Sequence, residues 1–439
     1  MWIRVLSILN LYKGSTKQVV TLTILSYTIS SFLLNATIDD QIMFDGFLDD
    51  LDSYSYLKVG QWILGGEATH HIGIRPFLFS FIVGLLYTLG GSFLVWIYQC
   101  IAYLIAHLLL VKSIRIITEK NRFVRWCSLL YLINFSLVGL TYHALAEPTV
   151  VCGFSILLYL SAKLYKNKIE KGKYYSWTIF ILALLIVVKP VFFYPFLLFI
   201  FLTFFQVIRK KMTFKEVPKL PLFIALLALC VQYAILYANF HVLKISFISE
   251  ITYKNYLLSQ VIMEESKVDR VQAIALAKEM SAKELSTYSV DHFGQLRFYF
   301  FKNLKENIQS DPFFQSYSDE SVNGLHTEIV KFYNKASLYI QLFILFAGAY
   351  LVLNRKKITS PMIHGTFVLL WLVLFYYIFV TGISYDQRDR LVMGALPLWI
   401  FFLLVILNAL LPIIQKNKNE QKMQKNFNVD NDTLRAENH

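Results

Sequence analysis

Long apolar stretches alternate along this chain with short polar segments, and this alternation predicts its architecture. Apolar stretches of about 14 to 24 residues have roughly the length of helices that cross a bilayer. The stretches that we assign as membrane spans are 19–38, 93–111, 126–140, 149–164, 175–188, 191–208, 220–242, 336–353, 364–380 and 391–414. We therefore expect an all-α polytopic membrane protein with about ten transmembrane helices. The first stretch is too long for the apolar core of a cleavable signal peptide, so we expect it to be a signal anchor.

The charges between these stretches predict how the spans are oriented. Lys and Arg gather on the cytoplasmic side of membrane proteins. With ten spans and both termini inside, 26 of the 42 basic residues fall on the cytoplasmic side, whereas 22 of the 29 acids fall outside. We expect a multi-pass protein of the cell membrane (inner or plasma membrane) with cytoplasmic termini and acid-rich outer loops.

The segment 76–91 is apolar but is not counted among the spans. It has fourteen residues before Gly90-Gly91, which is short for a span. If it crossed the membrane, the basic segment 112–125 and every later basic cluster would lie outside, against the charge bias. We therefore expect a juxtamembrane or re-entrant helix here, within a first outer loop that covers 39–91.

A long polar region, 241–335, separates the two groups of apolar stretches. Within it, residues 264–285 have apolar positions at helical spacing and alternating charges, which predicts a helix. The expected organisation is an N-terminal transmembrane core over 1–240, an extracytoplasmic helical insert over 241–335 that rests on the membrane surface, C-terminal transmembrane helices over 336–414, and a disordered cytoplasmic tail over 415–439.

Composition agrees with a membrane protein. Hydrophobic residues make up 56% of the chain and charged residues only 16%, where a soluble domain has about 25% charged residues. The net charge of +13 arises from clusters between the spans, so it indicates membrane orientation and no nucleic-acid partner. The four cysteines lie in or beside apolar segments without paired spacing, which argues against a zinc site or a disulfide framework.

The first outer loop concentrates the groups that could do chemistry. Its segment 39–75 holds seven of the 29 acids and two histidines. A helix that starts near Leu51 would place Asp52 close to its N-terminus, one turn from Tyr56. The candidate catalytic carboxylates are Asp52, Asp50 and Asp45, with Asp49 as a further acid of the same loop.

Other ionisable groups lie on the same predicted membrane face. Charged groups at membrane depth are costly and usually have a function or a partner. Glu147 and Lys189 stand out because each lies at the edge of otherwise apolar helices. Carboxylates that face cations suit the transfer of a phosphate-linked group, since a carboxylate can accept a proton or bind a metal while Arg and Lys hold phosphate. The candidate substrate-binding residues are Arg75, Lys189, Tyr56, His71, His143, Arg388 and Arg390.

Four short segments carry a family resemblance. They are Asp52-Ser-Tyr-Ser-Tyr56, Arg75-Pro-Phe-Leu-Phe79 with the later Gly90-Gly91, Ala144-Leu-Ala-Glu147-Pro148, and Arg388-Asp-Arg390 ahead of Pro397. Their order resembles that of the GT-C superfamily of membrane glycosyltransferases, which includes protein O-mannosyltransferases and the aminoarabinose transferases of lipid A. The chain departs from the family pattern at Phe77, where a second proline is usual, and it has no clean Asp-Glu pair in the first loop.

The resemblance implies a glycosyltransferase that moves a sugar, with inversion, from a polyprenyl-phosphate donor to an extracytoplasmic acceptor. The acceptor would be a glycan, a lipid or a protein, and the other partners would be membrane lipids. A first-loop aspartate, Asp52 before the others, would act as general base, and Arg75, Lys189, Arg388 or Arg390 would neutralise the leaving lipid phosphate. Some members use a divalent metal and others do not, so Glu147 is a candidate ligand for Mg²⁺ or Mn²⁺.

Two other classes fit part of the pattern. An O-antigen polymerase or ligase also handles polyprenyl-linked sugars and has a large late outer loop, but it would rely on Arg and His of late loops and would not need an acidic first loop. A transporter or flippase for a lipid-linked sugar predicts charges within helices and paired halves. The charges here gather on one membrane face and the sequence shows no such symmetry, so we expect the transferase.

Overall fold

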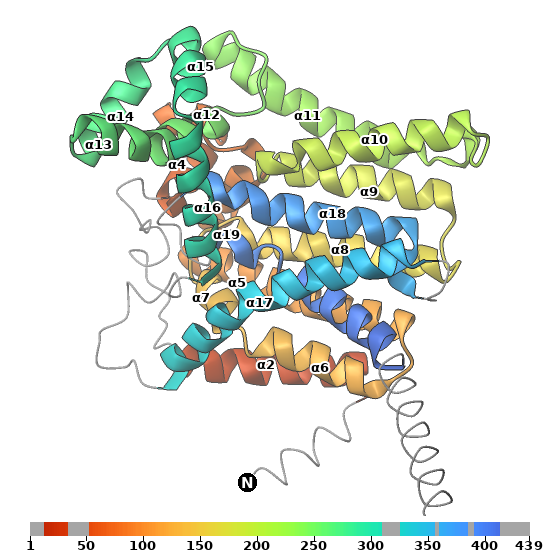
Figure 1. Ribbon diagram of the computed structural model, residues 1–439. Helices are drawn as coiled ribbons and strands as arrows, with labels where there is room; N and C mark the ends of the chain where they lie inside the picture. Colours follow the sequence, from red (N-terminus) through yellow and green to blue (C-terminus); the bar gives the residue numbers. More distant parts are fainter. Residues whose placement is uncertain (1–12, 34–51, 310–324, 356–359, 385–389, 413–439) are drawn as a thin grey trace, which may run out of the picture.

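Figure 1 shows a bundle of long helices that lie side by side, with several shorter helices gathered at one end. The structure is a computed structural model, and it describes residues 13–33, 52–309, 325–355, 360–384 and 390–412. These residues contain helices and no strand, so the expected all-α fold is confirmed over the described part of the chain.

The described residues form the following elements in chain order. The elements are α2 (Thr16–Leu33), α4 (Asp52–Ile63), η1 (His70–Gly73), α5 (Phe77–Ile117), α6 (Asn121–Leu132), α7 (Phe135–Leu140), α8 (Glu147–Tyr165), α9 (Lys171–Ile186), η2 (Pro190–Phe192), α10 (Phe193–Ile208), η3 (Phe214–Glu216), α11 (Lys219–Phe240), α12 (Ile248–Thr252), η4 (Tyr253–Leu258), α13 (Ser259–Ser266), α14 (Arg270–Glu279), α15 (Ala282–Asp291), α16 (Phe293–Gln309), α17 (Leu325–Leu353), η7 (Pro361–Ile363), α18 (Gly365–Val380), η8 (Thr381–Ile383) and α19 (Arg390–Met393).

Several of these helices have the length and composition of membrane spans. Within the described residues, six are long and apolar enough to cross a membrane: Phe77–Ile117, Glu147–Tyr165, Pro190–Ile208, Lys219–Phe240, Lys335–Leu353 and Gly365–Ile383. A shorter apolar helix covers Leu396–Pro412. A multi-pass membrane protein is therefore supported, while the expected count of ten spans is not confirmed.

Two of the expected helices are divided where a polar side chain caps a new helix. The stretch 126–140 is split between α6 and α7, because the Asn134 side chain accepts a hydrogen bond from the Leu137 amide at 2.8 Å and starts α7. The expected helix 264–285 is split between α13, α14 and α15. There Asp269 caps α14, and Ser281 with Glu284 forms a capping box at the start of α15.

The long helix α5 contains the expected break at Gly90-Gly91. Both residues have non-helical backbone angles, and the φ of Gly91 is 63°, a value that glycine adopts without steric cost. A straight helix of 41 residues would rise about 60 Å, twice the thickness of the bilayer hydrocarbon. The part after the break, 92–117, is long enough to span by itself, which leaves 77–89 free for the juxtamembrane role that the sequence predicts.

The first part of α5 packs closely against α4. A Cβ atom added to Gly60 would overlap the Ser80 carbonyl oxygen and would lie 2.8 Å from the Cα atom of Gly84. Small residues at such crossings let two helix backbones approach each other. This contact fixes the position of α4 relative to α5, and hence of the residues at the N-terminal ends of both helices.

We expect Gly60→Ala to destabilise the protein by about 1–3 kcal/mol, because the added methyl group forces the two helix backbones apart. The measurement is the thermal unfolding midpoint of the purified protein in detergent. Gly365→Ala is the matched control, since a Cβ there meets no atom within 4 Å. Equal midpoints for the two variants would contradict the close crossing.

The short helices at one end have an apolar cluster of their own. It contains Leu257, Leu258, Val261, Ile262, Ala273, Ala277 and Leu296, from η4, α13, α14 and α16. In Figure 1 these helices lie at the end of the bundle opposite the loops that join α8 to α9 and α10 to α11. Those two loops carry basic clusters that the charge bias assigns to the cytoplasm. These short helices and the two basic loops thus lie at opposite ends of the bundle.

Candidate functional site

Five charged residues from distant parts of the sequence meet at one end of the bundle. Asp52 is the first residue of α4, Glu147 the first of α8, and Arg390 the first of α19. Arg75 lies two residues before α5, and Lys189 directly precedes η2. All five therefore stand at the N-terminal ends of helices, and ion pairs join them into one network.

Asp52 lies between two arginines. One carboxylate oxygen accepts a hydrogen bond from the Arg75 guanidinium and the other accepts one from the Arg390 guanidinium. Arg75 is held further by Ser55 Oγ, which accepts from its Nε at 2.7 Å. Its guanidinium also lies over the ring of Tyr56, 4.7 Å from the ring centroid, a favourable cation–π distance. The N-terminal end of α4 thus supplies three side chains that orient Arg75: Asp52, Ser55 and Tyr56.

Glu147 forms the second anionic centre of the network. Its Oε1 accepts hydrogen bonds from Lys189 Nζ at 3.1 Å and from Arg390 Nε at 3.2 Å. Lys189 Nζ also donates to the hydroxyl of Tyr377 at 3.4 Å. Arg390 therefore bridges the two carboxylates, since its Nη2 contacts Asp52 and its Nε contacts Glu147.

The network carries a net positive charge. Two carboxylates face three cations, and their side chains are buried or half-buried. Burial opposes the ionisation of Asp52, but the charges of Arg75 and Arg390 outweigh it and hold the pKa of this carboxyl below its usual range. A site with one surplus cation among partly desolvated groups is suited to receive an anion.

Hydrogen bonds to the backbone fix the elements that present these residues. Gln99 of α5 is buried, and its Nε2 donates to the carbonyl oxygens of His143 at 3.0 Å and Leu145 at 2.9 Å. These carbonyls belong to the turn directly before Glu147. The Tyr98 and Thr149 hydroxyls lie 2.8 Å apart and join the same two helices. The part of α5 that follows Gly91 therefore sets the position of the N-terminal end of α8.

The structure brings together most, but not all, of the candidate residues that it describes. Asp52, Arg75, Lys189 and Arg390 are in the network, and Tyr56 packs against it. His71 lies in η1, where its ring is tilted against that of His70, with the ring centroids 3.8 Å apart. His143 is buried in the turn between α7 and α8 and contributes its carbonyl oxygen to the contact with Gln99. The remaining candidates, Asp45, Asp50 and Arg388, with Asp49, lie outside the described residues.

Two residues of the site did not emerge from the sequence. Tyr377 lies in the apolar helix α18, where a tyrosine is typical of a membrane interface, yet its hydroxyl accepts from Lys189. Its ring packs edge-on against Phe154 at 5.4 Å. Ser55 lies in the motif that includes Asp52, and its spacing of three residues from Asp52 places both on one helix face. This spacing could have identified Ser55 as a site residue from the sequence. No feature of the sequence distinguishes Tyr377 from other tyrosines of apolar helices.

The donor set does not favour a metal at Glu147. Both described partners of this carboxylate are cations, which would repel a divalent metal ion. The described residues contain no group of three or more His, Cys, Asp and Glu side chains that could hold one.

Comparison of this chain with models of protein families, with curated proteins and with solved structures finds no match.

Proposed function

We propose that this protein is an integral membrane glycosyltransferase that moves a sugar, with inversion, from a polyprenyl-phosphate donor to an extracytoplasmic acceptor. The observation that carries the proposal is the network in which Asp52 and Glu147 face Arg75, Lys189 and Arg390. A buried ion-pair network adds little stability compared with apolar residues of the same volume. Five charged residues at one end of an apolar bundle therefore indicate a function in binding or chemistry.

The three cations would hold the phosphate of the donor. Arg75 and Arg390 both reach the same carboxylate, so their guanidiniums lie close enough to contact one phosphate group together. Guanidinium groups can donate two parallel hydrogen bonds to phosphate oxygens. Lys189, which contacts the same oxygen of Glu147 as Arg390, would add a third positive charge. As the bond between sugar and phosphate breaks, these charges stabilise the negative charge on the departing polyprenyl phosphate.

Asp52 would act as the general base. An acceptor hydroxyl attacks the anomeric carbon of the sugar and passes its proton to the Asp52 carboxylate. The bond between the anomeric carbon and the phosphate oxygen breaks on the opposite face, and its electron pair leaves with the polyprenyl phosphate. Attack from the face opposite the leaving group inverts the configuration at the anomeric carbon. A positioned base of this kind contributes about 10²–10⁴ in rate.

The binding of phosphate would also make Asp52 a stronger base. Without a donor, the carboxylate is neutralised by two arginines, which lower its pKa and its affinity for a proton. A phosphate that draws Arg75 and Arg390 toward itself weakens both ion pairs. The carboxylate then lies beside an added negative charge, which raises its pKa. The base would thus be activated by the substrate whose transfer it catalyses.

The movement of Arg75 and Arg390 from Asp52 toward the donor phosphate predicts different pH profiles for the free and the donor-bound enzyme. Because the pKa of Asp52 in the free protein is below the usual value of about 3.9, the acid limb of kcat/KM for the donor, which reports the free enzyme, should lie below about pH 4. The acid limb of kcat should lie at a higher pH, since it reports the donor-bound complex. The stability that the Asp52 ion pairs provide should likewise be complete above about pH 4 and lost below it. A kcat/KM limb near pH 6 would assign the base to another group.

The donor test decides the proposed function. Purified protein, reconstituted in lipid, is supplied with a panel of radiolabelled polyprenyl-phosphate monosaccharides, and released polyprenyl phosphate is measured. Release of polyprenyl phosphate from one donor by the wild-type protein, but not by Asp52→Asn, would support the transferase. If no donor is turned over but one is moved across the membrane, the proposal fails in favour of a transporter.

A further inference from the structure

Helix α16 lies across the end of the bundle and is fixed there by one of its faces. Figure 1 shows it at a steep angle to α8 and α18. Asn307, which is buried, donates from Nδ2 to the carbonyl oxygens of Thr381 at 2.9 Å and Ser384 at 2.7 Å. The ring of Phe300 packs on that of Phe379 at 4.6 Å. These contacts bind α16 to the end of α18 and to η8.

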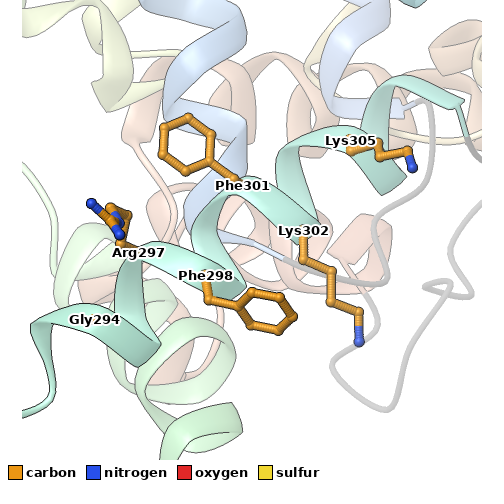
Figure 2. Close-up of a pocket in the computed structure, with 6 residues that line it drawn as sticks. All are labelled: Gly294, Arg297, Phe298, Phe301, Lys302 and Lys305. Carbon is orange, nitrogen blue, oxygen red and sulfur yellow. The ribbon is translucent and has the colours of Figure 1, made fainter.

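Another face of α16 carries a stripe of aromatic and basic side chains around a shallow hollow of about 480 Å³. We call this face the α16 stripe; it consists of Gly294, Arg297, Phe298, Phe301, Lys302 and Lys305. The spacing of these residues places them along one side of a helix. Figure 2 shows Arg297 on one side of the two rings and Lys302 and Lys305 on the other. Phe298 is 63% exposed and Phe301 is 53% exposed.

The α16 stripe adjoins an exposed aromatic surface at the end of a candidate membrane span. The Phe301 ring lies 6.4 Å from that of Phe379. Phe379 is 52% exposed and lies in the last turn of α18, within a helix that is long and apolar enough to span a membrane. The aromatic part of the stripe therefore continues the outer surface of the bundle at the end of a span, where the hydrocarbon of a bilayer meets its headgroups.

The positive charge of the α16 stripe favours contact with an anionic surface. Arg297, Lys302 and Lys305 are accompanied on α16 by a single acid, Glu306, although the region 241–335 holds twelve acids in all. Basic side chains beside exposed aromatic rings are typical of helices that lie in the bilayer interface and contact anionic lipids.

We propose that the α16 stripe docks on the bilayer in which the bundle sits and binds the headgroups of anionic phospholipids. Phe298 and Phe301 enter the boundary between headgroups and acyl chains, and the three cations contact lipid phosphates above it. Anchored in this way, α16 holds η8, which directly precedes the segment that leads to Arg390. The proposal does not depend on the activity of the ionic network.

The first test measures the depth of the stripe in the membrane. Phe298→Cys is introduced into the full chain after the four native cysteines have been replaced by serine, and it is labelled with an environment-sensitive fluorophore in nanodiscs. Lipids with a spin label near the headgroup should quench this fluorophore strongly. Val271→Cys on α14, where the native side chain is 78% exposed, is the matched control and should remain in water. Equal, weak quenching at both positions would overturn the proposal and indicate a surface for a protein partner or a second copy.

The second test measures the preference for anionic lipid. Spin-labelled phosphatidylglycerol and phosphatidylcholine are compared for their association with the protein in nanodiscs. Lys302→Gln with Lys305→Gln should reduce the preference for phosphatidylglycerol by about fivefold for each cation removed. Lys302→Arg with Lys305→Arg should retain it, which separates charge from misfolding. An unchanged preference in the glutamine variant would show that the stripe does not bind anionic headgroups.

Discussion

Asp52→Asn is expected to lower the rate of sugar transfer about a thousandfold. Asparagine has nearly the shape of aspartate and can still accept a hydrogen bond from Arg75 or Arg390. It cannot take a proton from the acceptor hydroxyl, and loss of a general base costs about 10²–10⁴ in rate. The measurement is polyprenyl phosphate released per enzyme under single-turnover conditions with saturating donor.

The kinetic constants separate two roles for Asp52. If it acts as base, kcat falls and the donor KM changes little, because an interaction of the transition state has been lost. If it only positions Arg75 and Arg390, donor binding weakens and kcat is largely kept. Glu67→Gln is the matched control, since Glu67 is an exposed acid of the same loop and should be neutral. Activity of Asp52→Asn within tenfold of wild type would remove Asp52 as the base and direct attention to Asp45, Asp49 and Asp50.

The sequence predicts the members of the ionic network better than their pairing. Asp52 and Arg75 are predicted from the acid-rich first outer loop, Glu147 and Lys189 from their position at the edges of apolar helices, and Arg390 from the loop before the last span. The same argument placed them on one membrane face. Which carboxylate meets which cation depends on how helices pack, and this packing brings together residues up to 338 positions apart.

The positions of helix ends were predicted less well, for physical reasons that individual residues illustrate. Apolar periodicity predicts that a helix exists, but capping decides where it starts. Asn134 divides an expected span, and Ser281 with Glu284 starts a new helix inside a segment that looked continuous. In contrast, Gly90-Gly91 was recognised as a break, because adjacent glycines interrupt a helix through their own backbone freedom.

Glu147→Gln is expected to destabilise the protein by about 3 kcal/mol, because it leaves Lys189 without its carboxylate partner. The Glu147 side chain is only 2% exposed, so water does not replace the lost interaction. Arg390 keeps Asp52 as a partner and is affected less. The measurement is the free energy of unfolding in mixed detergent micelles, followed by the loss of helix signal.

Removing Lys189 as well should restore most of the lost stability. In Glu147→Gln with Lys189→Met, no unpaired ammonium group remains, and methionine fills a similar volume beside Tyr377. The four proteins of this double-mutant cycle should therefore show a coupling energy of about 2 kcal/mol between the two positions. The double variant should still fail to transfer sugar, since Lys189 is lost as a phosphate ligand. Additive destabilisation would contradict the pairing, and full activity of the stable double variant would exclude Lys189 and Glu147 from the mechanism.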